Sequence, residues 1–159
     1  MGQGTTFKVY FPQVTAELGL IKKPEPIRHD APQGQETILV VEDDELLRTI
    51  ISRALSRFGY QVLAAAHGAE ALETVEHSAA AIHLLITDVV MPHLNGPELA
   101  ARLTALYPEM KVLYMSGYTD NAIVHHGVLD HALWFLQKPF PITTLLQKVR
   151  EVLDAPPTT

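Results

Sequence analysis

Short apolar runs alternate with segments of helical periodicity along most of the chain, from Glu36 onward. The apolar runs predict five β-strands, at residues 38–41, 61–65, 84–87, 111–115 and 133–136. Apolar residues spaced three and four apart predict helices at 46–58, 68–77, 99–106, 121–126 and 142–153, and the pattern is weakest at 121–126. Each predicted strand is therefore followed by a predicted helix.

The predicted strands are apolar apart from Gln61, Thr87 and Lys111 at their ends, and they do not alternate with polar residues. Strands of this kind are buried on both faces, and together with intervening helices they form a parallel sheet that is covered on both sides. We therefore expect an α/β fold with a doubly wound, five-stranded parallel sheet. Open sheets of this class bind ligands in the crevice at the carboxyl ends of their strands.

The first 35 residues differ in character from the rest of the chain. They hold a Gly/Thr-rich start, a short β-like run at 6–11, and a polar segment with Pro24, Pro26, Pro32 and Gly34. Prolines and charges leave little apolar surface to bury, so this segment is predicted to be a linker. A chain of 159 residues then fits one ordinary domain with extensions.

Composition excludes several function classes. Hydrophobic residues make up 47% of the chain, enough for a core, whereas the net charge of -6 offers no basic surface to nucleic acid. The lack of cysteine excludes disulfides, thiolate metal sites and cysteine nucleophiles. No apolar run is long enough to span a bilayer, and the first residues lack a signal-peptide pattern. We therefore expect a soluble, cytoplasmic chain without nucleic-acid or membrane contacts.

Polar residues of complementary chemistry follow four of the five predicted strands. The first strand leads into Glu42 and Asp43, the third into Asp88, the fourth into Ser116 and the fifth into Lys138. The carboxyl ends of parallel strands meet at one edge of a sheet. We therefore expect three carboxylates, one hydroxyl and one ammonium group to converge there.

Three carboxylates gathered at one edge repel one another. At about 4 Å and an effective dielectric constant of about 20, each pair costs roughly 4 kcal/mol, so either their pKa values rise or a cation binds among them. Oxygen ligands with room for water suit Mg2+. Phosphoryl transfer needs mainly positioning and charge neutralisation, and a carboxylate can be its nucleophile. The strand ends thus hold the parts of an Mg2+-dependent phosphoryl-transfer site.

Each feature also has a simpler interpretation. The acidic run 42–45 is typical of a capped first helical turn, and its last two residues are assigned only that role. Taken alone, Asp88 fits a loop cap, Ser116 a turn residue and Lys138 a surface lysine. All of these interpretations would have to hold together at four separate strand ends, which favours the joint site.

Residues 37 to 153 resemble the response-regulator receiver family over the whole length of that domain. The motifs that carry the resemblance are Ile38-Leu39-Val40-Val41-Glu42-Asp43-Asp44, Thr87-Asp88-Val89-Val90-Met91-Pro92 with Asn95-Gly96, Ser116-Gly117 and Lys138-Pro139-Phe140. Their ordered set is far more specific than any one of them. The resemblance implies the flavodoxin-like strand order 2-1-3-4-5 and a phosphoryl group taken from a phosphohistidine, in a two-component or phosphorelay system.

The same resemblance implies a metal site and a phosphoacceptor. Asp88 corresponds to the phosphoacceptor, and the family's acidic pair falls on Glu42 and Asp43. Asp43 is then a direct Mg2+ ligand, Glu42 acts mostly through water, and the backbone carbonyl of Val90 supplies a further ligand. Glutamate at the first position is a common variant in the family.

The resemblance also implies residues that sense the phosphoryl group. Ser116 hydrogen-bonds a phosphoryl oxygen, Lys138 pairs with the phosphoryl group and Asp88, and Gly117 leaves space for it. Phe135 occupies the family's aromatic switch position, where the ring moves inward as Ser116 shifts, although a buried phenylalanine fits a core equally well. The surface of the last two helices is then the surface that changes. The Lys138-Pro139 bond corresponds to a cis peptide.

Residues 2–12 resemble the end of a histidine-kinase ATPase domain, in which a Gly-x-Gly-Thr-x-Phe box leads into the final strand. The other boxes of that domain are absent, so we expect neither useful ATP binding nor autophosphorylation. The two resemblances imply the C-terminal part of a hybrid sensor histidine kinase, with an N-terminal segment at 1–36, a receiver at 37–154 and a tail at 155–159. The expected partners are a histidine kinase domain, in cis or in trans, and a histidine phosphotransfer protein. An unrelated disordered leader is the alternative origin of the first segment.

Two other functions stay open. An aspartyl-phosphate phosphohydrolase carries a second acid just after its nucleophile, but Val89 and Val90 follow Asp88. A receiver-like interaction module without phosphoryl turnover would have lost an acid, the hydroxyl or the lysine, and none is lost. Whether self-catalysed phosphorylation and dephosphorylation make the fragment an enzyme is open as well.

Overall fold

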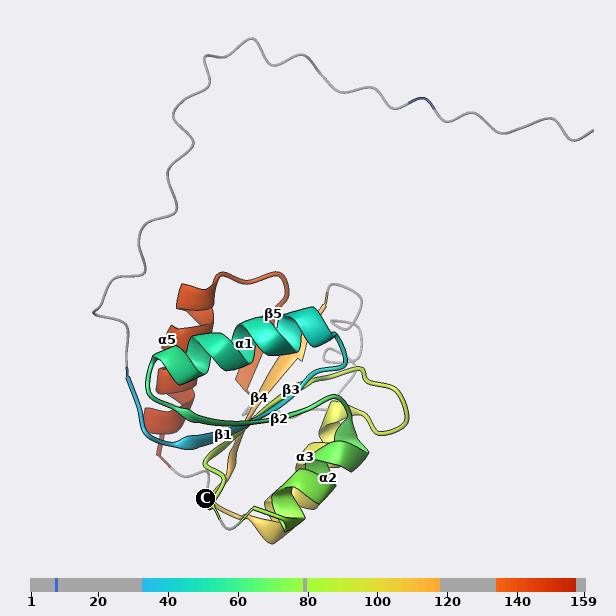
Figure 1. Cartoon of the computed structure of the whole chain (residues 1–159), viewed down its shortest axis with the longest axis vertical. Helices are drawn as coiled ribbons and strands as arrows, with labels where there is room; N and C mark the ends of the chain where they lie inside the picture. Colours follow the sequence, from blue (N-terminus) through green and yellow to red (C-terminus); the bar gives the residue numbers. More distant parts are fainter. Residues whose placement is uncertain (1–7, 9–32, 79, 118–133, 157–159) are drawn as a thin grey trace, which may run out of the picture.

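Five strands form one parallel sheet in the computed structural model, which describes residues 8, 33–78, 80–117 and 134–156. The strands are β1 Thr37–Val41, β2 Gln61–Ala65, β3 Leu84–Asp88, β4 Lys111–Ser116 and β5 Trp134–Gln137. Their order is β2-β1-β3-β4-β5, with every neighbouring pair parallel (Figure 1). The prediction of a doubly wound sheet in the order 2-1-3-4-5 is confirmed.

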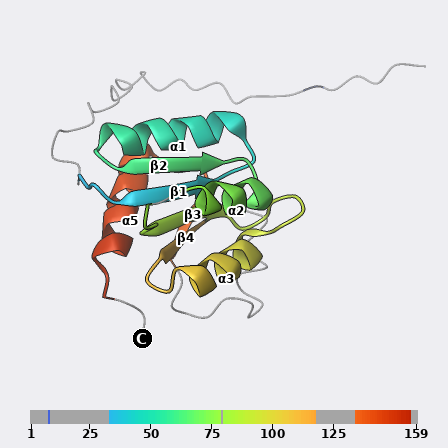
Figure 2. The same ribbon diagram turned by 60° about the horizontal axis from the view of Figure 1, so that its bottom comes forward.

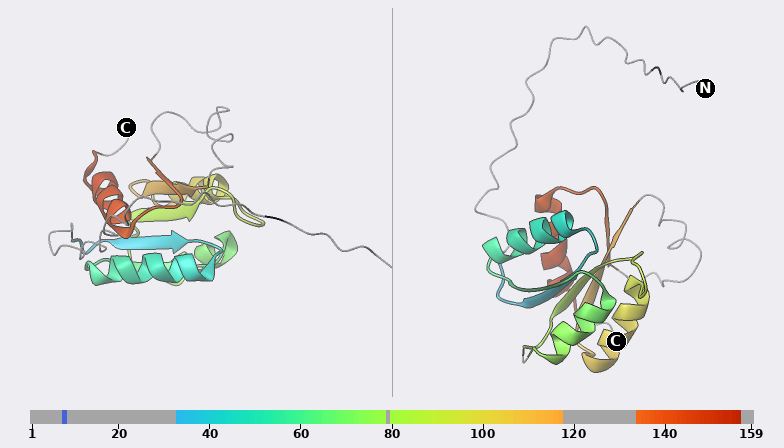
Figure 3. Two further views of the ribbon diagram at one scale, coloured as in Figure 1. Left: turned by 90° about the horizontal axis from the view of Figure 1, so that it is seen from above. Right: turned by 45° about the vertical axis from the view of Figure 1, so that its right-hand side comes forward.

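Four helices in the described residues cover the two faces of the sheet. They are α1 Glu45–Arg57, α2 Gly68–Glu76, α3 Gly96–Leu106 and α5 Ile142–Asp154. Helices α1 and α5 lie on one face, and α2 and α3 lie on the other (Figures 2 and 3). The predicted helix at 121–126 and the first residue of the predicted fifth strand, Leu133, lie outside the described residues.

Each face of the sheet has its own apolar core. Ile38, Val40 and the other strand residues on the same face of the sheet pack against α1 and α5. On the opposite face, Leu39, Val41 and Leu85 pack against α2 and α3. All five residues of β1 are buried, because the strand lies between β2 and β3 and under helices on both faces. This two-sided burial explains why the strands have unbroken apolar sequences. No helix in the described ranges is long and apolar enough to cross a membrane.

Local signals decide where the helices begin. The Asp44 side chain accepts the Leu47 N–H at 2.9 Å as the N-cap of α1. At α3, the Asn95 side chain accepts the Glu98 N–H at 2.9 Å, and Pro97 lies in the first turn. Helix α3 therefore begins at Gly96, three residues before its predicted start, because the cap lies upstream of the first apolar residue.

Candidate functional site

The loop between β1 and α1 supplies two of the three carboxylates. Glu42 follows the buried β1 directly and is only 1% exposed, whereas Asp43 is exposed. The Asp44 N–H donates to Glu42 Oε1 at 3.4 Å, and Asp44 itself turns away to cap α1. The loop therefore presents Glu42 and Asp43 to the sheet edge and leaves Asp44 to the helix, as the sequence predicted.

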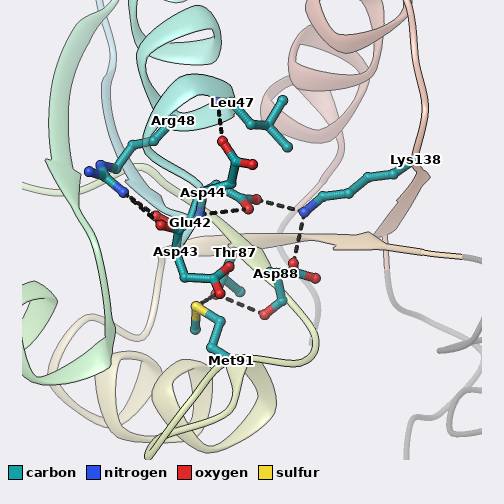
Figure 4. A network of polar contacts seen from close by, with 9 residues as sticks. All are labelled: Glu42, Asp43, Asp44, Leu47, Arg48, Thr87, Asp88, Met91 and Lys138. Atoms are coloured by element: carbon teal, nitrogen blue, oxygen red, sulfur yellow. Dashed lines mark hydrogen bonds and ion pairs between the residues drawn. The ribbon is translucent and has the colours of Figure 1, made fainter. Parts of the chain in front are cut away.

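Arg48 holds this loop in place, a role that the sequence analysis did not identify. Its Nη1 donates to the backbone carbonyl of Glu42 at 2.6 Å and to that of Asp43 at 3.4 Å (Figure 4). The guanidinium thus satisfies two carbonyls at the turn and adds one positive charge beside the acids. An arginine on the first turn of the helix was the available signal, but its target is set by the direction of the backbone carbonyls.

Asp88 is the last residue of β3 and is held by backbone contacts on both sides. The Val89 N–H donates to Met115 O of β4 at 3.0 Å, and the Gly96 N–H donates to Val89 O at 3.1 Å. The buried Thr87 hydroxyl donates to the Asp88 carbonyl at 3.1 Å. The chain at Asp88 is therefore fixed to β4 and to the start of α3, which determines the direction of its carboxylate.

The three predicted acids come together at the carboxyl edge of the sheet. One carboxylate oxygen from each of Glu42, Asp43 and Asp88 lies within 4.8 Å of the others. Lys138, which follows β5, places its Nζ 2.7 Å from Glu42 Oε2 and 2.7 Å from Asp88 Oδ2 (Figure 4). One ammonium group thus bridges two of the three carboxylates and leaves the cluster with excess negative charge.

The shifted pKa values agree with this crowding. Burial raises the pKa of Glu42 above its ordinary value, and the negative charge of Asp88 adds to the effect, although the hydrogen bond to Lys138 opposes both. Burial lowers the pKa of Lys138, but the hydrogen bonds to Asp88 and Glu42 outweigh it and raise that pKa overall. Lys138 therefore stays charged, while Glu42 bears the cost of a buried carboxylate.

The donor set of the cluster fits a hard divalent cation. All the candidate ligand atoms are carboxylate oxygens, and Lys138 balances only one of their charges. Asp88 Oδ1 is buried and has no hydrogen-bond partner among the described residues. A buried carboxylate oxygen without a partner is costly, and a cation would relieve that cost. Glu42, Asp43 and Asp88 are the described side chains that could hold Mg2+.

The other predicted site residues lie around this cluster. Ser116 is buried at the end of β4, where its carbonyl accepts the Lys138 N–H at 2.8 Å. Val90 is 50% exposed in the loop that follows β3. On β5, the half-buried ring of Phe135 stacks on Tyr114 with the ring centroids 5.5 Å apart, and the Lys138-Pro139 peptide bond is cis.

Glu42→Gln is expected to stabilise the fold near about pH 7 by on the order of 1 kcal/mol. The raised pKa means that the native state binds the Glu42 proton more tightly than the unfolded state does. Glu42 therefore weakens stability as pH rises through its folded pKa, and the amide removes this loss. Denaturant unfolding in EDTA, near about pH 7 and again near about pH 4, measures the effect.

The gain should shrink near about pH 4, where glutamate is largely protonated in both states. Glu45→Gln is the matched control, because Glu45 is exposed in the first turn of α1 and outside the cluster. It should be neutral or slightly destabilising through the helix dipole. A Glu42→Gln protein that is less stable near about pH 7 would mean that the Lys138 ion pair outweighs the cost of burial.

Comparisons with known proteins agree with this geometry. A family profile for the response regulator receiver domain matches residues 38–150. The sensor kinase CckA of Brucella abortus is 34% identical over 160 residues, an alignment that covers 97% of this chain but only 17% of that protein. The response regulator receiver protein CpdR of the same organism is 33% identical over 118 residues, which are 74% of this chain and 97% of CpdR.

Solved structures give the same result. The receiver domain of the hybrid histidine kinase CckA has a TM-score of 0.62 at 35% identity, over 74% of this chain and 99% of that one. A response regulator receiver protein from Sinorhizobium medicae WSM419 has a TM-score of 0.66 at 30% identity, over 76% of this chain and 96% of that one. The fold, the strand-end residues and these similarities agree, and the chain belongs to the response regulator receiver domain family of two-component signalling.

Proposed function

We propose that this chain accepts a phosphoryl group from a phosphohistidine on the carboxylate of Asp88, with Mg2+ bound beside it. The observation that carries the proposal is the contact geometry of Asp88. One of its oxygens is paired with Lys138 at 2.7 Å, and the other is buried without a partner among the described residues. Two further carboxylates lie within metal-binding distance. A structural aspartate would have both oxygens satisfied.

The proposed reaction forms one bond and breaks one. A carboxylate oxygen of Asp88 attacks phosphorus, the P–N bond to the donor imidazole breaks, and the imidazole keeps that electron pair and takes up a proton. In this proposal Lys138 pairs with the developing phosphoryl charge, and the hydroxyl of Ser116, a buried residue at the end of the neighbouring strand, donates to a phosphoryl oxygen. The protein thereby contributes positioning and charge neutralisation.

The proposed Mg2+ ligands are Asp43 and Asp88 directly, Glu42 mostly through water, and the backbone carbonyl of Val90. When bound, the ion neutralises negative charge on the cluster and on the incoming phosphoryl group. The chain contributes the arrangement: Arg48 fixes the carbonyls of the loop that carries Glu42 and Asp43.

We also propose that phosphorylation changes the surface formed by the last two predicted helices and the strand between them, β5. Ser116 and Lys138 lie at the ends of neighbouring strands β4 and β5, and Phe135 lies on β5 three residues before Lys138. A shift of Ser116 toward a phosphoryl oxygen would alter the packing of the Phe135 ring on Tyr114. That is a local charge event acting on a two-state surface.

The alignment with CckA supports an origin for the chain. It covers 97% of the chain and so extends beyond residues 38–150 into the N-terminal segment. We propose that residues 1–36 are the end of a kinase ATPase domain with its linker, followed by a receiver at 37–154 and a tail at 155–159. The partners are then a histidine kinase domain and a histidine phosphotransfer protein, and the compartment is the cytoplasm.

Intact mass spectrometry after incubation with acetyl phosphate and Mg2+ tests the proposed function. We expect one added phosphoryl group in the presence of Mg2+, and none when EDTA removes the metal, because the carboxylate cluster then repels the donor. Mild base should remove the adduct, since an acyl phosphate is labile. If no adduct forms and donor hydrolysis stays at background, the chain is better described as a receiver-like interaction module.

A further inference from the structure

A second polar cluster lies at the opposite edge of the sheet, where β1 begins and α5 ends. Arg150 Nη2 lies 2.8 Å from Glu36 Oε1 and 2.8 Å from Asp154 Oδ1. Glu36 Oε2 and the hydroxyl of Tyr60 are buried nearby and have no hydrogen-bond partner among the described residues. Arg150 thus joins the residue that precedes β1 to the last turn of α5.

The chain just before β1 packs closely against this cluster. The Gly34 N–H donates to Phe58 O at 3.2 Å, and Glu36 O accepts the Gln61 N–H at 3.0 Å. A Cβ on Gly34 would overlap the Glu36 carboxylate and the Tyr60 ring. Residues 34–36, the end of the proposed linker, therefore pack against the folded unit, although the family match begins at residue 38. We name Gly34, Glu36, Tyr60, Arg150 and Asp154 the linker clasp.

Two ion pairs join the residues that flank β1 to the later part of the chain, at opposite edges of the sheet. At the carboxyl edge, Glu42 after β1 pairs with Lys138, which precedes α5, at 2.7 Å. At the other edge, Glu36 before β1 pairs with Arg150 in α5 at 2.8 Å. Strand β1 is fixed inside the sheet, and α5 is a continuous helix of about 20 Å. Arg150 lies on this helix, so a rigid-body movement of α5 would also displace the linker clasp.

We propose that the linker clasp is coupled to the phosphorylation state of Asp88. Phosphorylation then weakens the contacts between the receiver and the segment that precedes β1. This proposal rests on the proposed function. Lys138 has one ammonium group, which Asp88 and Glu42 now share. Phosphoryl oxygens on Asp88 would attract the Lys138 ammonium group away from Glu42. The ion pair between Glu42 and Lys138 at the carboxyl edge would then break. Helix α5 then shifts relative to β1, and the pair between Glu36 and Arg150 weakens.

The alternative is that Glu36 and Arg150 form only a part-exposed surface ion pair. Such a pair would contribute little to stability and would not respond to phosphorylation. The seating of Gly34 and the buried oxygen atoms beside it argue against that, because they place the pair inside a packed contact. The two interpretations differ in one measurable property. Only a coupled clasp changes when the opposite edge of the sheet is modified.

Amide hydrogen exchange at Gly34 and Gln61, before and after treatment with acetyl phosphate and Mg2+, tests the coupling. Both N–H groups donate to backbone carbonyls at the clasp. We expect exchange at these amides to be about fivefold faster in the phosphorylated protein. A factor of this size is at the lower end of typical allosteric coupling between two sites. Intact mass is measured on the same samples. An adduct with unchanged or slower exchange overturns the clasp proposal alone, whereas the lack of any adduct overturns it together with the proposed function.

Two variants open the clasp in different ways. Glu36→Gln removes the charge, and Gly34→Ala obstructs the seating without changing any charge. Each should show fast exchange at Gln61 before treatment, with little further change after it. Because coupling is reciprocal, each should also raise the ratio of phosphorylated to unphosphorylated protein by about fivefold, measured at an acetyl phosphate concentration that modifies only a small part of the unaltered protein.

Glu151→Gln is the matched control, because Glu151 pairs at 2.9 Å with Lys148 within α5 and so does not connect α5 to β1. It should behave like the unaltered protein in both measurements. Retained slow exchange in β1 and β3 verifies that each variant is folded. Clasp variants that leave the phosphorylated fraction unchanged would overturn the proposal.

Discussion

Asp88→Asn is expected to reduce phosphoryl uptake from acetyl phosphate by at least about 1,000-fold, to background. An amide is a poor nucleophile, and no other described carboxylate combines a pairing with Lys138 and a buried oxygen without a partner. Glu42 also pairs with Lys138, but it lies deeper and bears the cost of burial. Intact mass spectrometry over a time course measures the rate for both proteins.

Asp44→Asn is the matched control for the loss of one carboxylate near the site. Asp44 caps α1 by accepting the Leu47 N–H at 2.9 Å, and asparagine caps helices as well as aspartate does. The control should therefore be phosphorylated at the rate of the unaltered protein. If Asp88→Asn still gained one phosphoryl group, the acceptor would lie elsewhere, and Asp43 would be the next residue to replace.

The sheet could be predicted from the sequence because its inner strands β1, β3 and β4 are buried on both faces for most of their length. Burial on both sides demands an unbroken apolar run, and such a run is visible in a single sequence. Strand β2 has the predicted bounds, and β1 and β4 each differ by one residue. Helix starts were less accurate where a cap lies ahead of the apolar pattern, as Asn95 does at α3.

The meeting of the strand ends could also be predicted, because parallel strands place their carboxyl ends at one edge. Glu42, Asp43, Asp88 and Lys138 come together there as expected. Their chemical roles stay predictions until phosphorylation is measured. The structure adds the distances, and these show that one ammonium group serves two carboxylates.

Contacts between remote segments could not be predicted in this way. Arg48 donates to backbone carbonyls, whose directions no sequence pattern encodes. Glu36 and Arg150 lie at nearly opposite ends of the folded unit in sequence, and each alone has the character of an ordinary surface charge. Their pairing depends on α5 returning across the face of the sheet to the start of β1.

Gly96→Ala is expected to destabilise the fold by about 2–3 kcal/mol, the size typical of overpacking a closed site. A Cβ on Gly96 would overlap the Asp88 carbonyl oxygen and approach its carbon at 3.1 Å. Because these are backbone atoms of the proposed phosphoacceptor, relief requires a shift of Asp88 itself. Phosphoryl uptake should therefore fall by about tenfold or more in the protein that remains folded, since small displacements of a reacting group are costly.

Denaturant unfolding and the phosphorylation time course measure the two effects separately. Gly68→Ala is the control, because the three atoms nearest to a Cβ there all belong to the side chain of Leu94, at 2.5 Å for Cδ2 and 2.9 Å for Cβ. Relief there requires a shift of the half-buried Leu94, six residues after Asp88, and not of Asp88 itself, so this variant should lose stability and keep its rate of phosphorylation. Equal loss of rate in both variants would mean that the packing of the loop as a whole, and not the contact between Gly96 and Asp88, sets the position of the acceptor.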